Sequence, residues 1–258
     1  MFVHTIDPVL LELGPFQIRY YGLFFVLGFI VAYFMLRFLA KERHINLTKD
    51  EIADYVLYSA IGIVLGARIF YIVFYNLPFY LENPLRIFAL WQGGLSFHGG
   101  LTGAIVTTYI FCKKKKLHIY DILDMAVIPA ALGLALGRLG NFTNGELYGR
   151  ITNVPWAVQF PGAEGFRHPS QFYESFKNLA IFFILFMIRN RNLPRGILFW
   201  MFVALYSIFR FFIEFFREAD AQIGYFFGWM TMGQILCIIF LVISLYFLDK
   251  IRKTEVRK

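Results

Sequence analysis

The chain has 258 residues, of which 59% are hydrophobic and only 16% are charged, and its mean hydropathy is +0.59. A soluble domain carries about 25% charged residues and lacks apolar runs of some twenty residues, so this composition excludes a soluble globular protein. The formal net charge of +8 could indicate a nucleic-acid-binding protein, but the basic residues stand at the ends of apolar segments and form no single surface. We therefore expect a polytopic membrane protein that binds no nucleic acid.

Seven apolar segments are each long enough to cross about 30 Å of hydrocarbon as a helix. Their expected limits are 18–38, 53–75, 94–112, 119–140, 171–189, 196–216 and 225–249. The predicted fold class is thus all-α, with seven transmembrane helices in a single transmembrane domain over residues 1–258. The first segment is not expected to be a cleaved signal, because Asp7 and Glu12 stand where a signal carries positive charge.

Lysine and arginine are distributed unequally between the two sides of these spans. They are concentrated after the first, third, fifth and seventh spans, at Arg37, Lys41, Arg43, Lys49, Lys113, Lys114, Lys115, Lys116, Arg189, Arg191, Arg195 and along the C-terminal tail. Cytoplasmic loops are enriched in these residues, so we expect the N-terminus outside and the C-terminus in the cytoplasm. The run of four lysines is expected to lie against anionic membrane lipids.

The two longest connections are expected on the outer side. Residues 76–93 combine prolines with aromatic residues, which is typical of an arm lying in the membrane interface. Residues 141–170 contain prolines, glycines and a strand-like stretch from Trp156 to Phe160, and we expect them to form a small external cap between the fourth and fifth spans.

Charged residues occur inside the apolar segments, although an arginine at the bilayer centre costs about 2.5–3.5 kcal/mol on insertion scales. They are Arg68, Arg138, Arg210, Arg217, Asp54, Asp124, Glu174 and Glu214. Any one of them could be a structural ion pair between helices. Taken together they favour an anion-binding site, because cations outnumber the evident partners toward the outer ends of the spans.

The sixth span contains the clearest polar pattern, YSIFRFFIEFFRE, residues 206–218. Tyr206, Arg210, Glu214 and Arg217 are spaced four, four and three residues apart, which places them on one face of a helix. Glu214 is expected to bridge the two arginines. Two arginines that share one carboxylate retain positive charge, which suits an anionic ligand.

The third span begins in WQGGLSFHGG, residues 91–100, where His98 lies between two pairs of glycines. A lone histidine in a membrane helix is commonly a hydrogen-bonded packing residue. Glycine allows a backbone or a ligand to approach closely, so His98 could instead exchange protons near neutral pH. We expect no metal, because neither HExxH nor a second histidine at ligand spacing accompanies it.

The fourth span ends in GRLGNFTNGELYG, residues 137–149, which combines Arg138, Asn141 and Glu146 with four glycines. Irregular backbone at membrane depth is tolerated only where it is buried in protein or lines a cavity. We therefore expect this stretch to form one wall of a polar site.

Five motifs together resemble one known family. In chain order they are RYYG, GGLSFHGG, GRLGNFTNGELYG, RHPSQFYES and YSIFRFFIEFFRE. They resemble the phosphatidylglycerol–prolipoprotein diacylglyceryl transferases of bacterial inner membranes. The resemblance implies seven spans, a site toward the periplasmic side, and transfer of diacylglyceryl from phosphatidylglycerol to the lipobox cysteine of a preprolipoprotein signal peptide. A thioether forms and glycerol phosphate leaves.

The resemblance also implies the residues of the site. His98, Tyr206, Arg138 and Arg210 are the expected catalytic residues, with His98 as the candidate base for the thiol and Tyr206 as its rival or a relay. Phosphatidylglycerol is expected to contact Arg138, Asn141, Arg210, Tyr21 and Gly149. The residues expected to support the site are Glu146, Glu214, Arg217 and His168. No metal or cofactor is expected in this scheme.

Two other functions also accommodate buried arginines. A transporter or channel for an anionic metabolite usually shows inverted repeats or paired broken helices, and the sequence shows neither. Another lipid-headgroup enzyme would differ in its acceptor. Neither explains the set of motifs as well as the diacylglyceryl transferase does.

Overall fold

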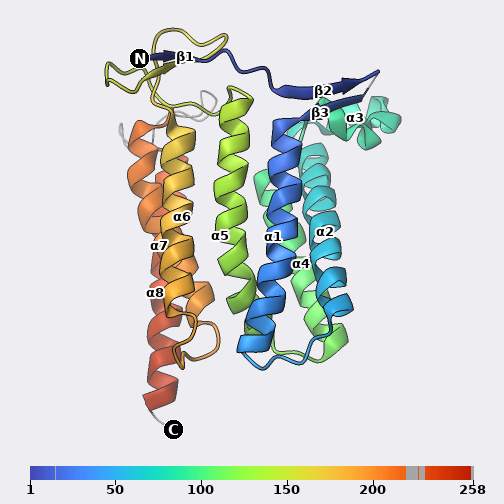
Figure 1. Ribbon diagram of the computed structural model, residues 1–258, viewed down its shortest axis with the longest axis vertical. Helices are drawn as coiled ribbons and strands as arrows, with labels where there is room; N and C mark the ends of the chain where they lie inside the picture. Colours follow the sequence, from blue (N-terminus) through green and yellow to red (C-terminus); the bar gives the residue numbers. More distant parts are fainter. Residues whose placement is uncertain (15, 219–225, 227–229, 257–258) are drawn as a thin grey trace. The chain divides into compact units, whose positions relative to one another are not determined.

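The computed structural model describes residues 1–14, 16–218, 226 and 230–256, and this part of the chain is mostly helical (Figure 1). Its contacts divide the chain into two compact units. The first unit comprises Met1–Met35 and Asp124–Lys258, and the second comprises Leu36–Leu123. The divisions fall inside helix α1 (Tyr20–Glu42) and near the start of helix α5 (Ile119–Thr143).

Short strands of the first unit pair in two places. Strand β1 (Phe2–Val3) runs parallel to β4 (Val158–Gln159), and Figure 1 shows β1 at the N-terminus beside the connection between α5 and α6. Strand β4 confirms the strand-like character expected between Trp156 and Phe160. Strands β2 (Val9–Leu13) and β3 (Phe16–Arg19) form an antiparallel hairpin, which was not predicted from the sequence.

Besides the first part of α1, the first unit contains most of α5 together with α6 (Ser170–Ile188), α7 (Ile197–Ile213), the 3-10 turn η3 (Glu214–Phe216) and α8 (Met232–Val256). Helix α7 packs against both α6 and α8. The carboxylate of Asp124 is fully buried and accepts hydrogen bonds at 2.8 Å from the backbone N–H groups of Gly196 and Phe199. Asp124 is therefore a structural charge, because it satisfies N–H groups that the start of α7 leaves without helical partners.

The second unit is built on a close pair of helices, α2 (Lys49–Tyr75) and α4 (Phe97–Lys115), which lie alongside each other in Figure 1. A side-chain carbon on Gly103 would lie 1.9 Å from the carbonyl oxygen of Gly62, and one on Gly99 would lie 2.3 Å from that of Gly66. The backbones thus touch at these positions, which is how small residues promote helix packing in membranes. The glycines beside His98 were expected to admit either a backbone or a ligand, and at Gly99 the close neighbour is the backbone of Gly66.

The connection from α2 to α4 contains helix α3 (Leu77–Glu82) and the 3-10 turns η1 (Pro84–Phe88) and η2 (Leu90–Gln92). Arg68, which is only 4% exposed, donates hydrogen bonds to backbone carbonyl oxygens of this segment, at Arg86, Ile87, Ala89, Gly93 and Gly94. This arginine was one of the charges that suggested an anion site. The structure instead gives it a structural role, since its guanidinium fixes the arm.

Six helices of the described residues are long and apolar enough to cross a membrane: α1, α2, α5, α6, α7 with η3, and α8. Many of their large apolar side chains are exposed, as in a helix that faces lipid. The third expected span corresponds to α4, which is not among the six and carries three lysines in its last turn, so a seventh span stays a prediction. The last expected span began at residue 225, whereas α8 begins at Met232, and residues 225 and 227–229 lie outside the described part of the chain.

Candidate active site

The polar face predicted for the sixth span forms on α7 and continues into η3. Arg210 Nη2 lies 2.8 Å from Glu214 Oε2, and Arg217 Nε lies 3.6 Å from the same oxygen. Glu214 therefore bridges the two arginines, as their spacing predicted. Its other oxygen, Oε1, accepts a hydrogen bond of 3.1 Å from the hydroxyl of Thr231, which precedes α8.

A second carboxylate, Glu174 of α6, lies at the centre of these charges. Its side chain is 1% exposed, and Arg210 Nη1 is paired with its Oε1. Arg217 Nη1 lies 4.0 Å from Oε1, while Arg138 Nε lies 3.9 Å and Lys177 Nζ 2.7 Å from Oε2. One buried carboxylate thus joins charges from α5, α6 and the end of α7.

We call the six linked side chains the ion network: Arg138, Glu174, Lys177, Arg210, Glu214 and Arg217. The network as defined contains four cationic and two anionic side chains, and all of its members are largely buried. Buried like charges are tolerated only with partners or with a ligand of opposite sign. This composition suits a bound anion.

Two members of the ion network were missed as site residues. Glu174 was noted only as one charge among several, and Lys177 was not singled out. Their spacing of three residues within the apolar helix α6 was the available signal, because it places both side chains on one face. Sequence alone does not reveal that this face turns toward α5 and α7.

The stretch 137–149 supports the ion network through a chain of hydrogen bonds. Helix α5 continues to Thr143, so Arg138 and Asn141 are still helical. Arg138 Nη1 donates to Asn141 Oδ1 at 3.4 Å, and Asn141 Nδ2 donates to Glu146 Oε1 at 2.8 Å. Glu146 is thereby connected to Arg138 through the Asn141 amide.

Helix α6 holds this stretch by its first residues. The Gln171 side chain donates to the carbonyl oxygen of Glu146 at 2.7 Å, and the Ser170 hydroxyl donates to that of Leu147 at 2.9 Å. Ser175 also donates to the carbonyl oxygen of Ala135 within α5, at 3.1 Å. These bonds fix α5 and its polar end against the helix that carries Glu174.

Tyr21 lies against the same stretch. A side-chain carbon on Gly140 would be 2.8 Å from Tyr21 Cδ2, so the absence of a side chain at Gly140 makes room for the tyrosine ring. Tyr21, in the first turn of α1, therefore lies beside Gly140, which stands between Arg138 and Asn141 in the sequence.

Gly149 and His168 lie at the junction between the α5–α6 connection and the end of η3. The Gly149 N–H donates to the His168 carbonyl oxygen at 2.8 Å, and Gly149 forms an isolated antiparallel bridge with Arg217. A side-chain carbon on Gly149 would lie 2.2 Å from the carbonyl oxygen of Phe216. Gly149 is thus required for a close backbone approach that holds Arg217 in place.

The His168 ring lies 5.2 Å from that of Phe216, and its Nδ1 is 3.1 Å from the Tyr173 hydroxyl. Burial lowers the pKa of the His168 imidazole below its usual range, which favours the neutral ring. Its contacts thus support the junction beside Arg217.

His98 belongs to the second unit. It lies in the first turn of α4, after Ser96, whose hydroxyl accepts a hydrogen bond of 3.4 Å from the Gly99 N–H. The His98 side chain is exposed, and its ring is 5.8 Å from that of Phe97. The close packing at Gly99 fixes the backbone next to this exposed imidazole.

The comparison with known families decides the class of protein. The family model described as prolipoprotein diacylglyceryl transferase matches residues 8–249.

The chain belongs to the prolipoprotein diacylglyceryl transferase family.

Relatives named phosphatidylglycerol–prolipoprotein diacylglyceryl transferase match nearly the whole chain. The protein from Geobacter sulfurreducens is 50% identical over 233 residues, which cover 90% of each chain. The protein from Oleidesulfovibrio alaskensis is 46% identical over 235 residues, covering 90% of this chain and 88% of the relative. The protein from Nitratidesulfovibrio vulgaris strain DP4 is 43% identical over 246 residues, covering 94% of each.

The matched segment contains both carboxylates of the ion network and all of its cations. It also contains the other residues that the resemblance implies: Tyr21, His98, Asn141, Glu146, Gly149, His168 and Tyr206. The ion network is therefore part of the prolipoprotein diacylglyceryl transferase match, and it is the candidate active site of the first unit.

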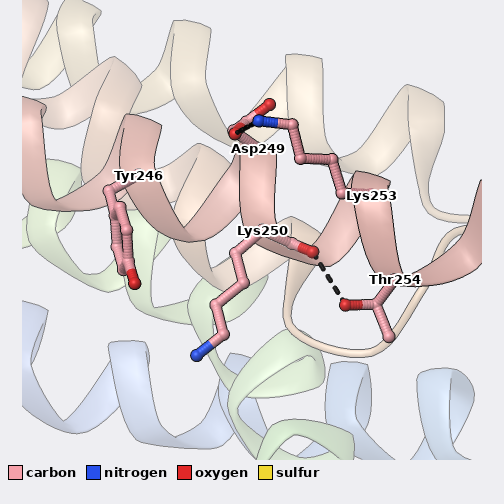
Figure 2. A pocket seen from close by; sticks show the side chains of 5 residues that line it. All are labelled: Tyr246, Asp249, Lys250, Lys253 and Thr254. Carbon is pink, nitrogen blue, oxygen red and sulfur yellow. Dashed lines mark hydrogen bonds and ion pairs between the residues drawn. The ribbon is translucent and has the colours of Figure 1, made fainter.

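A separate hollow of about 450 Å³ lies along the last turns of α8. Figure 2 shows the residues that line it: Tyr246, Asp249, Lys250, Lys253 and Thr254. Lys253 pairs with Asp249 at 2.6 Å, and the Thr254 hydroxyl donates to the carbonyl oxygen of Lys250 at 2.9 Å. All five residues belong to one helix and the pair is exposed, so we assign no ligand to this hollow.

Proposed function

We propose that this chain transfers the diacylglyceryl group of phosphatidylglycerol to the thiol of the lipobox cysteine of preprolipoproteins. It is a transferase, and its reaction is the first step of bacterial lipoprotein maturation. The observation that carries the proposal is the ion network, in which buried cations outnumber carboxylates in a membrane protein of this family. A lipid with an anionic headgroup suits such a site.

The proposal places the reaction in the bacterial inner membrane. The chain crosses it seven times as one transmembrane domain, with α4 as the third span and the N-terminus outside. The ion network then lies toward the periplasmic side, beside the cap formed by about residues 141–170. The unequal distribution of lysine and arginine supports this orientation.

The chemistry is a substitution at the glyceryl carbon that bears the phosphate. The cysteine sulfur forms a C–S bond, the C–O bond to the phosphate breaks, and its electron pair leaves with the oxygen of glycerol phosphate. The thiol proton passes to a base, because the thiolate is the nucleophile. The phosphate gains one negative charge, so fixed cations beside it stabilise the transition state.

Arg138 and Arg210 are the residues proposed to hold that phosphate. They come from α5 and α7, and both contact Glu174, so their guanidinium groups are held close together. Glu174 and Glu214 orient the arginines before the lipid arrives. Asn141 accepts from Arg138 and donates to Glu146, which supports an orienting role at the edge of the headgroup site.

Two residues are proposed for the proton. His98 carries an exposed imidazole at the start of α4, which suits a general base. Tyr206 is the rival or a relay, and its ring lies in the same unit as the ion network. Tyr21 and Gly149 are proposed to border the lipid, and Arg217 and His168 to support the junction. This scheme uses no metal and no cofactor.

The test incubates purified protein with phosphatidylglycerol and a lipobox peptide, followed by mass spectrometry of the peptide. We expect the mass of one diacylglyceryl group on the cysteine. Arg138→Ala and Arg210→Ala should each lower turnover roughly 100- to 1000-fold, the loss typical when a donor to a developing oxyanion is removed. Lys253→Ala is the matched control, because it removes an exposed cation outside the ion network and should leave turnover unchanged.

Variants of the two candidate bases separate their roles. His98→Gln should abolish transfer if His98 accepts the thiol proton, whereas near-normal turnover would assign that role to Tyr206. Tyr206→Phe is the reciprocal variant. An unmodified peptide with the wild-type protein would refute the proposed function, and near-normal turnover of Arg138→Ala would refute the phosphate assignment.

A further inference from the structure

Lys177 carries a buried amino group that has no part in binding the phosphate or in taking the thiol proton. Its side chain is 1% exposed, its Nζ lies 2.7 Å from Glu174 Oε2, and it lies 3.7 Å from the centroid of the Tyr206 ring. A charge within a membrane-spanning helix is costly unless it is paired or functional. The carboxylate and the aromatic face stabilise this cation without exposing it to water.

Lys177 shares its carboxylate with three arginines. Glu174 also contacts Arg138, Arg210 and Arg217, and its one negative charge cannot neutralise four cations. The ammonium therefore offsets the charge of Glu174, and the arginines keep more of their positive potential for another anion. Removing Lys177 would lower the charge of the site by one without removing an arginine.

We propose that Lys177 makes the ion network prefer a phosphate dianion to a phosphate monoanion. The inference rests on the proposed function, in which a monoanionic phosphodiester enters and a dianionic phosphomonoester leaves. Coulomb energy scales with the product of the charges, so each added cation favours the dianion twice as strongly. A site matched to the dianion stabilises the charge that develops as glycerol phosphate departs.

Lys177 acts here as a positioning residue, because it influences the phosphate through the charge of the site and through Glu174. The same preference predicts that free glycerol phosphate binds to the ion network and inhibits the enzyme. The methyl ester of glycerol phosphate is the matched ligand, since it keeps the phosphate and loses one negative charge.

The test measures the dissociation constants of both ligands by isothermal titration calorimetry at pH 7, where glycerol phosphate is mostly a dianion, with the full chain in detergent. A unit charge roughly 12 Å away at an effective dielectric constant of about 20 changes the affinity of a monoanion about tenfold and that of a dianion about a hundredfold. Lys177→Met should therefore lower the affinity ratio of dianion to monoanion about tenfold. Lys177→Arg keeps the charge and should keep the ratio.

Two further variants separate charge from structure. Glu174→Gln adds one net positive charge and should raise the ratio about tenfold. The double variant Lys177→Met/Glu174→Gln restores the net charge and should return the ratio to that of the wild type, even if each single variant is less stable. Thermal unfolding without ligand identifies variants that do not fold.

If Lys177→Met lowers the affinity for both ligands by the same factor, the inference is overturned, because the loss of a merely structural side chain would weaken the binding of both ligands alike. Failure of Lys177→Arg or of the double variant to retain the ratio would also overturn it, as would the absence of binding of either ligand to the wild type. Binding is measured without turnover, so the proposed function is judged separately. If the peptide is modified but Lys177→Met leaves the affinity ratio unchanged, only the role of Lys177 is refuted. If the ratio changes as expected but the peptide is not modified, only the transferase assignment is refuted.

Discussion

Three glycines within GRLGNFTNGELYG have different surroundings, although they belong to one motif. A side-chain carbon on Gly137 would meet no described atom within 4 Å. On Gly140 it would lie 2.8 Å from the ring of Tyr21 and 3.2 Å from its Cα, and on Gly149 it would lie 2.2 Å from the carbonyl oxygen of Phe216. Alanine substitutions at these positions should therefore differ in a fixed order.

The expected magnitudes follow from what each methyl group displaces. Gly137→Ala should be neutral or stabilising by up to about 1 kcal/mol, because alanine is the better helix former. Gly140→Ala should cost about 1–2 kcal/mol, since a ring can rotate but only at the expense of its packing. Gly149→Ala should cost about 3 kcal/mol or more, because a backbone carbonyl must move, together with the segment that carries Arg217.

The assay combines thermal unfolding in detergent with transfer to a lipobox peptide. Gly137→Ala should retain wild-type turnover, Gly140→Ala should lose part of it, and Gly149→Ala should be the least stable and the least active. Equal losses of stability and turnover at all three positions would show that the room available for a methyl group does not determine the effect of these substitutions. Full activity of Gly149→Ala would refute the assignment of its close approach to Phe216.

Three other substitutions test the supports of the fold. Asp124→Asn should destabilise the protein by about 1–3 kcal/mol in chemical unfolding, because the start of α7 loses a charged acceptor for two N–H groups. Gly103→Ala should loosen α2 from α4 and lower the melting temperature, whereas Gly100→Ala, with ordinary contacts from 3.4 Å, should be tolerated. Arg68→Met should free the arm between α2 and α4, and limited trypsin digestion should then cut at Arg86 faster than in the wild type.

The apolar segments could be predicted because a span requires a long run of one kind of residue. The six candidate spans overlap the expected ones, with ends that differ by several residues. Helix α4 is harder to recognise as a span, because its glycines and its terminal lysines both lower its hydropathy. The glycines are there because they allow close contact with α2. The hairpin of β2 and β3 was not foreseen, because two strands of four and five residues leave little pattern to read.

The charged residues show where sequence reasoning reaches its limit. The shared face of Tyr206, Arg210, Glu214 and Arg217 could be predicted because their spacings of four, four and three residues follow the period of a helix. Glu174 could not be recognised as the shared partner, since its contacts depend on the packing of three helices. Arg68 is also an arginine within an apolar segment, but its partners are backbone carbonyl oxygens. Every residue has such an oxygen, so the sequence does not indicate which ones Arg68 will contact.

The structural and the functional interpretations of the ion network are compatible. Arg210 contacts both Glu174 and Glu214, and these pairs make a buried arginine tolerable before any lipid binds. The same pairs fix its guanidinium, so little reorganisation is needed when charge develops on the phosphate. Two carboxylates among four cations orient the arginines and leave a net charge of +2 for an anionic ligand, and two further carboxylates would be needed to cancel that charge.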